Sequence, residues 1–230
     1  MGAVAVGGVS EEAGPGRGRV VAWTALVVTL AAIAYAGRAV GGEPDTNVVY
    51  EYAFGLAAVI QYGLLVLLAL WIAKGLPKRQ LFALRLPERP GRAAGLALAT
   101  FVAIFVVAGV LDRFLHAGKE QGLTPSGWDS AHAGAFAFSF FAIAVLAPLV
   151  EEVVYRGLGY SLLERVGAPL AIALTGLAFA AAHGLVAGLP VLWFFGSALA
   201  WLRRRTGSLY PGIGVHALFN AIALIASVAG

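Results

Sequence analysis

The chain has 230 residues, of which 60% are hydrophobic and only 12% are charged, and its mean hydropathy is +0.85. Soluble domains carry about 25% charged residues, so this chain has too little charge to cover a water-facing surface. Its formal net charge of +4 therefore indicates basic residues at membrane edges rather than a nucleic-acid surface. The absence of cysteine excludes disulfides, thiolate metal sites and cysteine nucleophiles.

The apolar runs of the chain predict an all-α, polytopic membrane bundle of about seven transmembrane helices, since one span needs about 20 mostly apolar residues. Residues 1–19 are Gly-rich and polar and are expected to form a flexible N-terminal tail. The predicted spans, in chain order, are Val20–Gly37, Tyr52–Ala73, Ala93–Leu115, a fourth that opens at Gly134–Val150, Pro169–Ala182, Val191–Leu202 and Leu209–Val228.

Lys and Arg gather in two of the predicted connections, Lys74–Arg92 and Arg203–Arg205. With a cytoplasmic N-terminus, both lie inside, and the connections Glu43–Glu51 and His116–Ala131 lie outside. We therefore predict this orientation, in a bacterial inner membrane. The alternative for the first apolar run is a cleaved secretory signal that ends near Ala34–Ala36.

Ionisable side chains inside a spanning helix cost about 2.5–3.5 kcal/mol each and are functional candidates by default. Counted from the cytoplasmic face, Glu151, His183 and His216 lie at similar depths, roughly 20, 22 and 15 Å at 1.5 Å per residue. One shared site would require this agreement in depth. The candidates form three motifs, which are Glu151-Glu152-Val153-Val154-Tyr155-Arg156, Phe179-to-His183 and His216-to-Asn220.

The spacing within the motifs also has structural interpretations. Glu152 and Arg156 are four residues apart, so they can pair on one helix face in a mainly structural role. Glu151 points about 100° away from Glu152 and is left free for chemistry. Either histidine alone could be a core residue bonded to a backbone carbonyl, and Asn220 could simply bridge two helices.

Taken together, the three motifs resemble the CPBP family of intramembrane proteases, which includes the CAAX prenyl proteases and bacteriocin-processing enzymes and is also called Abi. The run Arg203–Pro211 and Gly157 also look typical of that family. The resemblance covers roughly Ala133–Ile225, which divides the membrane domain into N-terminal helices at 20–130 and catalytic helices at 131–230.

This resemblance implies an intramembrane endopeptidase in which Glu151 activates water. His183 and His216 would bind or polarise the carbonyl and water, Asn220 would help to hold the oxyanion, and Glu152, Arg156 and Phe179 would support the site. A carboxylate in a low-dielectric cavity is a suitable base. Donors aimed at a developing oxyanion stabilise a tetrahedral intermediate.

The cofactor and the substrate stay open at this point. We expect no cofactor, but Glu151, His183 and His216 would also make a possible zinc set with water in the fourth position. The expected partner, besides the lipid bilayer, is a membrane protein or lipid-anchored peptide that carries a CAAX-type tail, a leader or a C-terminal sorting tail. No nucleic-acid partner is expected.

Two other classes of function fit parts of the sequence. Buried Glu, His and Arg side chains could form the proton relay of a proton-coupled carrier, although the chain shows no repeated halves. A non-catalytic immunity or scaffold membrane protein could keep the same fold. A serine peptidase and an aspartyl peptidase are disfavoured, because no nucleophile turn surrounds Ser197 and no Asp lies mid-span.

Overall fold

The protein is described by a computed structural model that places residues 16–41, 46–116, 120, 125 and 127–229. These residues form helices and connections without a strand. Five helical segments are long and apolar enough to cross a membrane. They are α1 (Arg17–Val40), α2 (Tyr52–Ile72), α4 (Pro90–Leu115), the continuous run Ser130–Val166 and α11 (Tyr210–Ala229).

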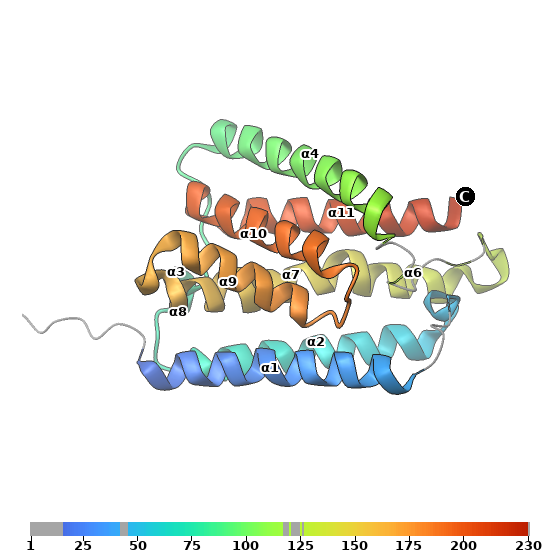
Figure 1. Ribbon diagram of the computed structural model, residues 1–230, viewed down its shortest axis with the longest axis horizontal. Coiled ribbons are helices and arrows are strands. Elements are labelled where there is room, and N and C mark those ends of the chain that lie inside the picture. Colours follow the sequence, from blue (N-terminus) through green and yellow to red (C-terminus); the bar gives the residue numbers. More distant parts are fainter. Residues whose placement is uncertain (1–15, 42–45, 117–119, 121–124, 126, 230) are drawn as a thin grey trace, which may run out of the picture.

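Two shorter helices, α9 (Ala168–Ala181) and α10 (Leu189–Thr206), complete the bundle. The run Ser130–Val166 contains a first 3-10 turn, then α6 (Ala133–Phe141), a π-helical segment (Ala142–Leu146), α7 (Ala147–Glu151), a second π-helical segment (Glu152–Gly159), α8 (Tyr160–Leu163) and a last 3-10 turn. The helices run along one axis, with α1 and α2 on one side and α4 on the other (Figure 1). The predicted all-α polytopic bundle is confirmed.

Proline in the first turn marks where most of the C-terminal helices begin. Pro90, Pro169, Pro190 and Pro211 each occupy one of the first two positions of a helix, where the missing N–H would have no intrahelical partner. The segment Lys74–Arg92, expected to be a connection between spans, contains helical residues. The short helix α3 (Lys78–Leu81) lies inside this segment, and α4 starts before Arg92.

The N-terminal boundary also differs from the expected one. Residues 1–15 of the predicted tail lie outside the described residues, but α1 begins at Arg17 rather than after Arg19. Arg19 donates to the backbone carbonyls of Ile72 and Lys74, at 3.1 and 2.9 Å. The first turn of α1 is therefore fixed to the end of α2.

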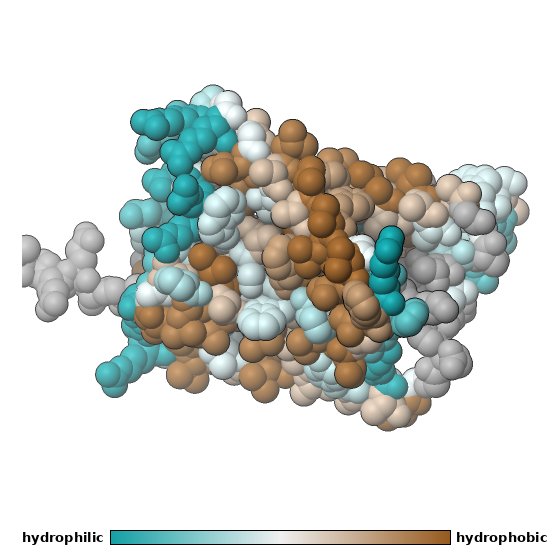
Figure 2. Space-filling view, turned by 45° about the horizontal axis from the view of Figure 1, so that its top comes forward, coloured by the Kyte–Doolittle hydropathy of each residue, from teal (hydrophilic) through white to brown (hydrophobic). Residues whose placement is uncertain are grey.

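The surface of the bundle divides into an apolar body and a polar end. Large apolar side chains such as Leu67, Leu98 and Leu218 are half or more exposed, which suits a lipid-facing surface and would be costly in water. Figure 2 shows hydrophilic residues gathered at the end where α1 begins. Together with the candidate spans, this pattern identifies an integral membrane protein.

Glycines let α9 and α10 approach closely. A Cβ atom on Gly196 would lie 2.8 Å from the Cα of Gly176 and 3.1 Å from Nη2 of Arg156. Small residues at such contacts are the usual route to tight helix packing in membranes. Because Gly196 has no side chain, the buried guanidinium of Arg156 also fits beside the backbone of α10.

Candidate active site

All four predicted catalytic residues line one cavity. The cavity has a volume of about 320 Å³ and lies between α2, the π-interrupted helix 130–166, the end of α9, α10 and α11. Its lining includes Glu151, His183, His216 and Asn220, together with Phe179. The similar depths expected from the sequence thus bring three separate motifs to one place.

Glu151 ends α7 and presents its two carboxylate oxygens to different neighbours. Oε1 accepts a hydrogen bond of 3.0 Å from the hydroxyl of Tyr62. Oε2 faces Nε2 of His216 at 3.6 Å. The carboxylate is therefore oriented by α2 on one side and directed at an imidazole on the other, with its side chain 12% exposed.

His216 is held from behind by a buried ion pair. Its Nδ1 lies 3.1 Å from Oε1 of Glu152, and the same oxygen accepts a hydrogen bond of 2.8 Å from Nη1 of Arg156. A carboxylate oxygen accepts, so Nδ1 of His216 carries a proton and Nε2 is the nitrogen that faces Glu151. Glu152 and Arg156 thus form the i,i+4 pair that the sequence suggested, behind His216, and both side chains are fully buried.

Gly212 on α11 makes the approach of Glu152 possible. A Cβ atom there would lie 3.0 Å from Oε2 of Glu152, an oxygen that is buried and has no hydrogen-bond partner within the described residues. Nη2 of Arg156 is buried and unpaired in the same part of the chain. Unpaired buried polar atoms are costly, so these two atoms offset part of the stabilisation that the ion pair provides.

His183 lies in the turn after α9 and is fixed by its own helix. Its Nδ1 lies 2.7 Å from the carbonyl oxygen of Phe179, and the two rings are 4.5 Å apart. Since a carbonyl oxygen only accepts, Nδ1 carries the proton and Nε2 is left as an acceptor in the neutral ring. Neutral His183 is thus suited to accept a hydrogen bond from water rather than to donate one to an oxyanion.

The turn that carries His183 is also anchored from outside the cavity. The carboxylate of Glu120 accepts hydrogen bonds from the backbone N–H groups of Val186 and Gly188, at 2.8 and 2.7 Å, and pairs with Arg38 at 2.9 Å. Partial burial opposes ionisation, but these two N–H donors and the Arg38 guanidinium outweigh it and lower the pKa of Glu120. The anchor therefore needs the ionised carboxylate.

Asn220 depends on an irregularity in the helix opposite. Its Nδ2 donates a hydrogen bond of 3.0 Å to the carbonyl oxygen of Ile143, which lies in the π-helical segment Ala142–Leu146. A π-helical turn interrupts the regular i to i+4 bonding and is frequent at functional sites. The second N–H of the amide is left for a ligand in the cavity.

The comparison with known families agrees with this geometry. Residues 133–222 match the family model described as type II CAAX prenyl endopeptidase Rce1-like. The chain carries an Rce1-like segment. The match confirms the resemblance to the CPBP intramembrane proteases, and it spans all three motifs. No curated protein and no solved structure matches the chain in the same comparisons.

The cavity also includes α2, which lies outside the Rce1-like segment. Tyr62 and Gln61 both line it, and neither was predicted from the sequence. The available signal was a Gln-Tyr pair in the middle of an otherwise apolar span, where polar side chains are expensive. Phe195 and Phe219 belong to the apolar part of the wall, with their ring centroids 5.1 Å apart.

The positions of Glu151, His183 and His216 bear on whether these side chains could bind zinc together. Within the described residues, no group of three or more His, Asp or Glu side chains is placed to hold a metal ion. His216 approaches Glu151, but the free nitrogen of His183 makes no contact with either residue among the hydrogen bonds and ion pairs of this region. The donors as placed do not fit a three-ligand zinc site of the usual kind.

Proposed function

We propose that the protein is an intramembrane endopeptidase that hydrolyses a peptide bond of a membrane-associated protein or peptide. One observation carries the proposal. The Glu151 carboxylate is fixed by Tyr62 and faces Nε2 of His216 at 3.6 Å, in a cavity that also contains His183 and Asn220. The match of residues 133–222 to an endopeptidase family supports it.

In the proposed reaction, Glu151 removes a proton from a water molecule as the water oxygen attacks the scissile carbonyl carbon. The proton on Glu151 then passes to the amide nitrogen as the C–N bond breaks, which yields a carboxylic acid and an amine. His183 accepts a hydrogen bond from the water through Nε2 and so helps to orient it. A positioned base of this kind contributes typically 10²–10⁴-fold in rate.

The free N–H of Asn220 donates to the oxyanion of the tetrahedral intermediate. A donor aimed at an oxyanion is worth about 10²–10³-fold in rate. His216 faces the same space and, when protonated, adds positive charge beside the intermediate. Glu152 orients the ring of His216 through Nδ1, and Arg156 holds the Glu152 carboxylate in place.

We further propose that the substrate is lipid-anchored, with a prenylated C-terminal CAAX-type tail as the first candidate because the matched family is described by that activity. Purified protein in liposomes would be incubated with farnesylated CAAX-type peptides, unprenylated versions and leader-type peptides. Mass spectrometry of the products would identify the cleaved bond. Cleavage restricted to the leader-type peptides would replace the prenyl substrate and keep the peptidase.

Glu151→Gln tests the chemistry, because the amide keeps the shape and loses the basic oxygen. We expect cleavage to fall at least 10²-fold while the peptide still binds. The matched control is Gln61→Glu, which changes a carboxamide to a carboxylate in the same cavity without replacing the base. Cleavage at the wild-type rate by Glu151→Gln would remove Glu151 as the base. Absence of cleavage of every peptide by the wild type would overturn the peptidase proposal in favour of a carrier or scaffold.

We also propose that the reaction needs no metal. Cleavage should persist after dialysis against a chelator, and purified protein should contain far less than one zinc per chain by elemental analysis. Loss of cleavage that added zinc restores would assign the metal to Glu151, His183 and His216 after a local rearrangement.

The proposed orientation places the start of α1 in the cytoplasm of a bacterial inner membrane. The chain has no cysteine, so single substitutions report unambiguously. Gln80→Cys in α3 and Ser130→Cys before α6 are both exposed. A membrane-impermeant maleimide should label only Ser130→Cys in intact cells, and labelling of Gln80→Cys alone would reverse the orientation.

A further inference from the structure

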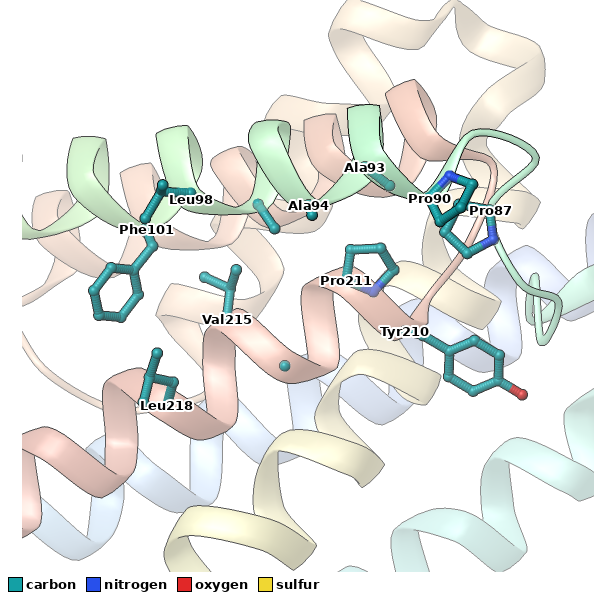
Figure 3. A pocket seen from close by; sticks show the side chains of 12 residues that line it. Pro87, Pro90, Ala93, Ala94, Leu98, Phe101, Tyr210, Pro211, Val215 and Leu218 are labelled. Atoms are coloured by element: carbon teal, nitrogen blue, oxygen red, sulfur yellow. The ribbon is translucent and has the colours of Figure 1, made fainter.

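A second hollow lies on the opposite side of α11 from the catalytic cavity. It is an apolar groove of about 490 Å³ between the first halves of α4 and α11, within the range of roughly 300–1,000 Å³ typical of ligand sites. Figure 3 shows Phe101 on α4 pointing toward Val215 and Leu218 on α11.

The groove has the length of one leaflet of a bilayer. From Ala93 to Phe101, α4 rises about 12 Å, and α11 rises the same amount from Tyr210 to Leu218, at 1.5 Å per residue. One leaflet of a hydrocarbon core is about 15 Å thick. The groove is therefore suited to a chain that lies along the helices rather than to a compact solute.

A basic pocket adjoins the groove at the polar end of the bundle. It is lined by Arg89, Arg92 and Arg205, with Glu88 as the one acidic member, so its side chains carry a net charge of about +2. Pro87 and Ala93 line both the pocket and the groove. None of the three arginines forms an ion pair with a carboxylate among the salt bridges of the described residues.

We propose that the groove and the pocket together form a binding site for an anionic phospholipid of the surrounding leaflet. The phosphate lies among Arg89, Arg92 and Arg205, and one acyl chain lies between α4 and α11. Arginine suits phosphate because its planar guanidinium donates two parallel hydrogen bonds. A zwitterionic lipid brings the same chains but less negative charge, so the basic pocket selects anionic headgroups.

This inference does not depend on the proposed peptidase activity, since no residue of the catalytic cavity lines either hollow. Its consequence for the fold is local. A bound lipid would fill the hollow between the two helices. It would also join α4, α10 and α11 at the polar end of the bundle.

The headgroup half of the proposal is tested by native mass spectrometry of the full chain released from nanodiscs that hold equal phosphatidylglycerol and phosphatidylcholine. We expect retained phosphatidylglycerol, with affinity about fivefold lower for each arginine removed. The test variant is Arg89→Gln/Arg92→Gln. The matched control is Lys74→Gln/Lys78→Gln, which removes the same charge from exposed positions on the same connection.

A second pair of variants tests whether the acyl chain lies in the groove. A Cβ atom on Gly214, which lines the groove, or on Gly95, which does not, would meet no atom within 4 Å. Gly214→Leu therefore fills the groove, whereas Gly95→Leu adds the same side chain to the lipid-facing surface of α4. We expect Gly214→Leu to lose retained phosphatidylglycerol and Gly95→Leu to keep it.

Three results would overturn the proposal. Equal retention of phosphatidylglycerol and phosphatidylcholine would remove the role of the arginines. Equal loss in the test and control variants would show adsorption to the bilayer only. Displacement of phosphatidylglycerol from the wild type by a farnesylated peptide, but not by the unprenylated version, would assign the groove to the lipid chain of a substrate.

Discussion

The buried pair of Glu152 and Arg156 offers the sharpest test of how the site is built. Both side chains are fully buried, with Nη1 of Arg156 2.8 Å from Oε1 of Glu152. At an effective dielectric constant of about 20, that separation corresponds to roughly 6 kcal/mol of attraction. Desolvation offsets much of it, and removing one partner from such a pair typically costs about 3–5 kcal/mol.

Arg156→Met is the perturbation, because methionine fills a similar volume and leaves Glu152 as an uncompensated buried charge. For a chain of this size, each kcal/mol lowers the midpoint temperature by about 2–4 °C, so we expect a fall of about 6–20 °C. Thermal unfolding in detergent, followed by tryptophan fluorescence, measures this change. The matched control is Arg204→Met on the exposed side of α10, which should shift the midpoint by no more than about 2 °C.

The double variant Glu152→Gln/Arg156→Met separates charge from packing. With both charges removed, no unpaired ion is left, so its midpoint should lie above that of Arg156→Met. Its cleavage activity should still be low, because Nδ1 of His216 loses its carboxylate partner. If Arg156→Met matched Arg204→Met in stability, the pair would not be buried as described, and the argument for His216 positioning would fail.

The other predictions concern the edges of the site. Tyr62→Phe removes the hydrogen bond to Glu151, which is worth about 1.5–3 kcal/mol when the acceptor is charged. We expect kcat/KM to fall about tenfold or more, whereas Tyr52→Phe on the same helix, whose hydroxyl bonds no described residue, should leave it unchanged. Equal effects of the two substitutions would remove Tyr62 from the site. For Glu120, the lowered pKa means that the anchor stabilises the fold above the usual carboxyl pKa and is lost as the pH falls through the lowered one. The difference in midpoint temperature between wild type and Glu120→Gln should accordingly be full at pH 7 and shrink toward pH 3, and a difference independent of pH would show that the charge is not what anchors the turn.

The sequence by itself determined the class of the protein and the identity of the candidate residues. The chain has half the usual charge and a series of apolar runs, which predicts a membrane protein. Its spans are predicted to be helices, since the bilayer requires each span to satisfy its own backbone hydrogen bonds. An ionisable side chain inside a span is costly, so a Glu or His in an apolar run is a functional candidate. The three motifs at residues 151–156, 179–183 and 216–220 could be found for this reason.

The tertiary structure decided what each of those residues contacts. No helical periodicity indicates that α2 meets the motif helices, so Tyr62 could not be paired with Glu151 from the sequence. The protonated nitrogen of His216 follows from an acceptor on Glu152 that only the packed fold brings within reach, whereas the acceptor for His183 is the carbonyl of Phe179, four residues earlier in the chain. In the π-helical turn the N–H of Ala147 bonds the Ala142 carbonyl, and the next residue, Pro148, has no N–H to offer the Ile143 carbonyl, which is therefore free for Asn220. Pro148 is visible in the sequence, but only the packed fold shows that Asn220 meets the carbonyl that it leaves unbonded.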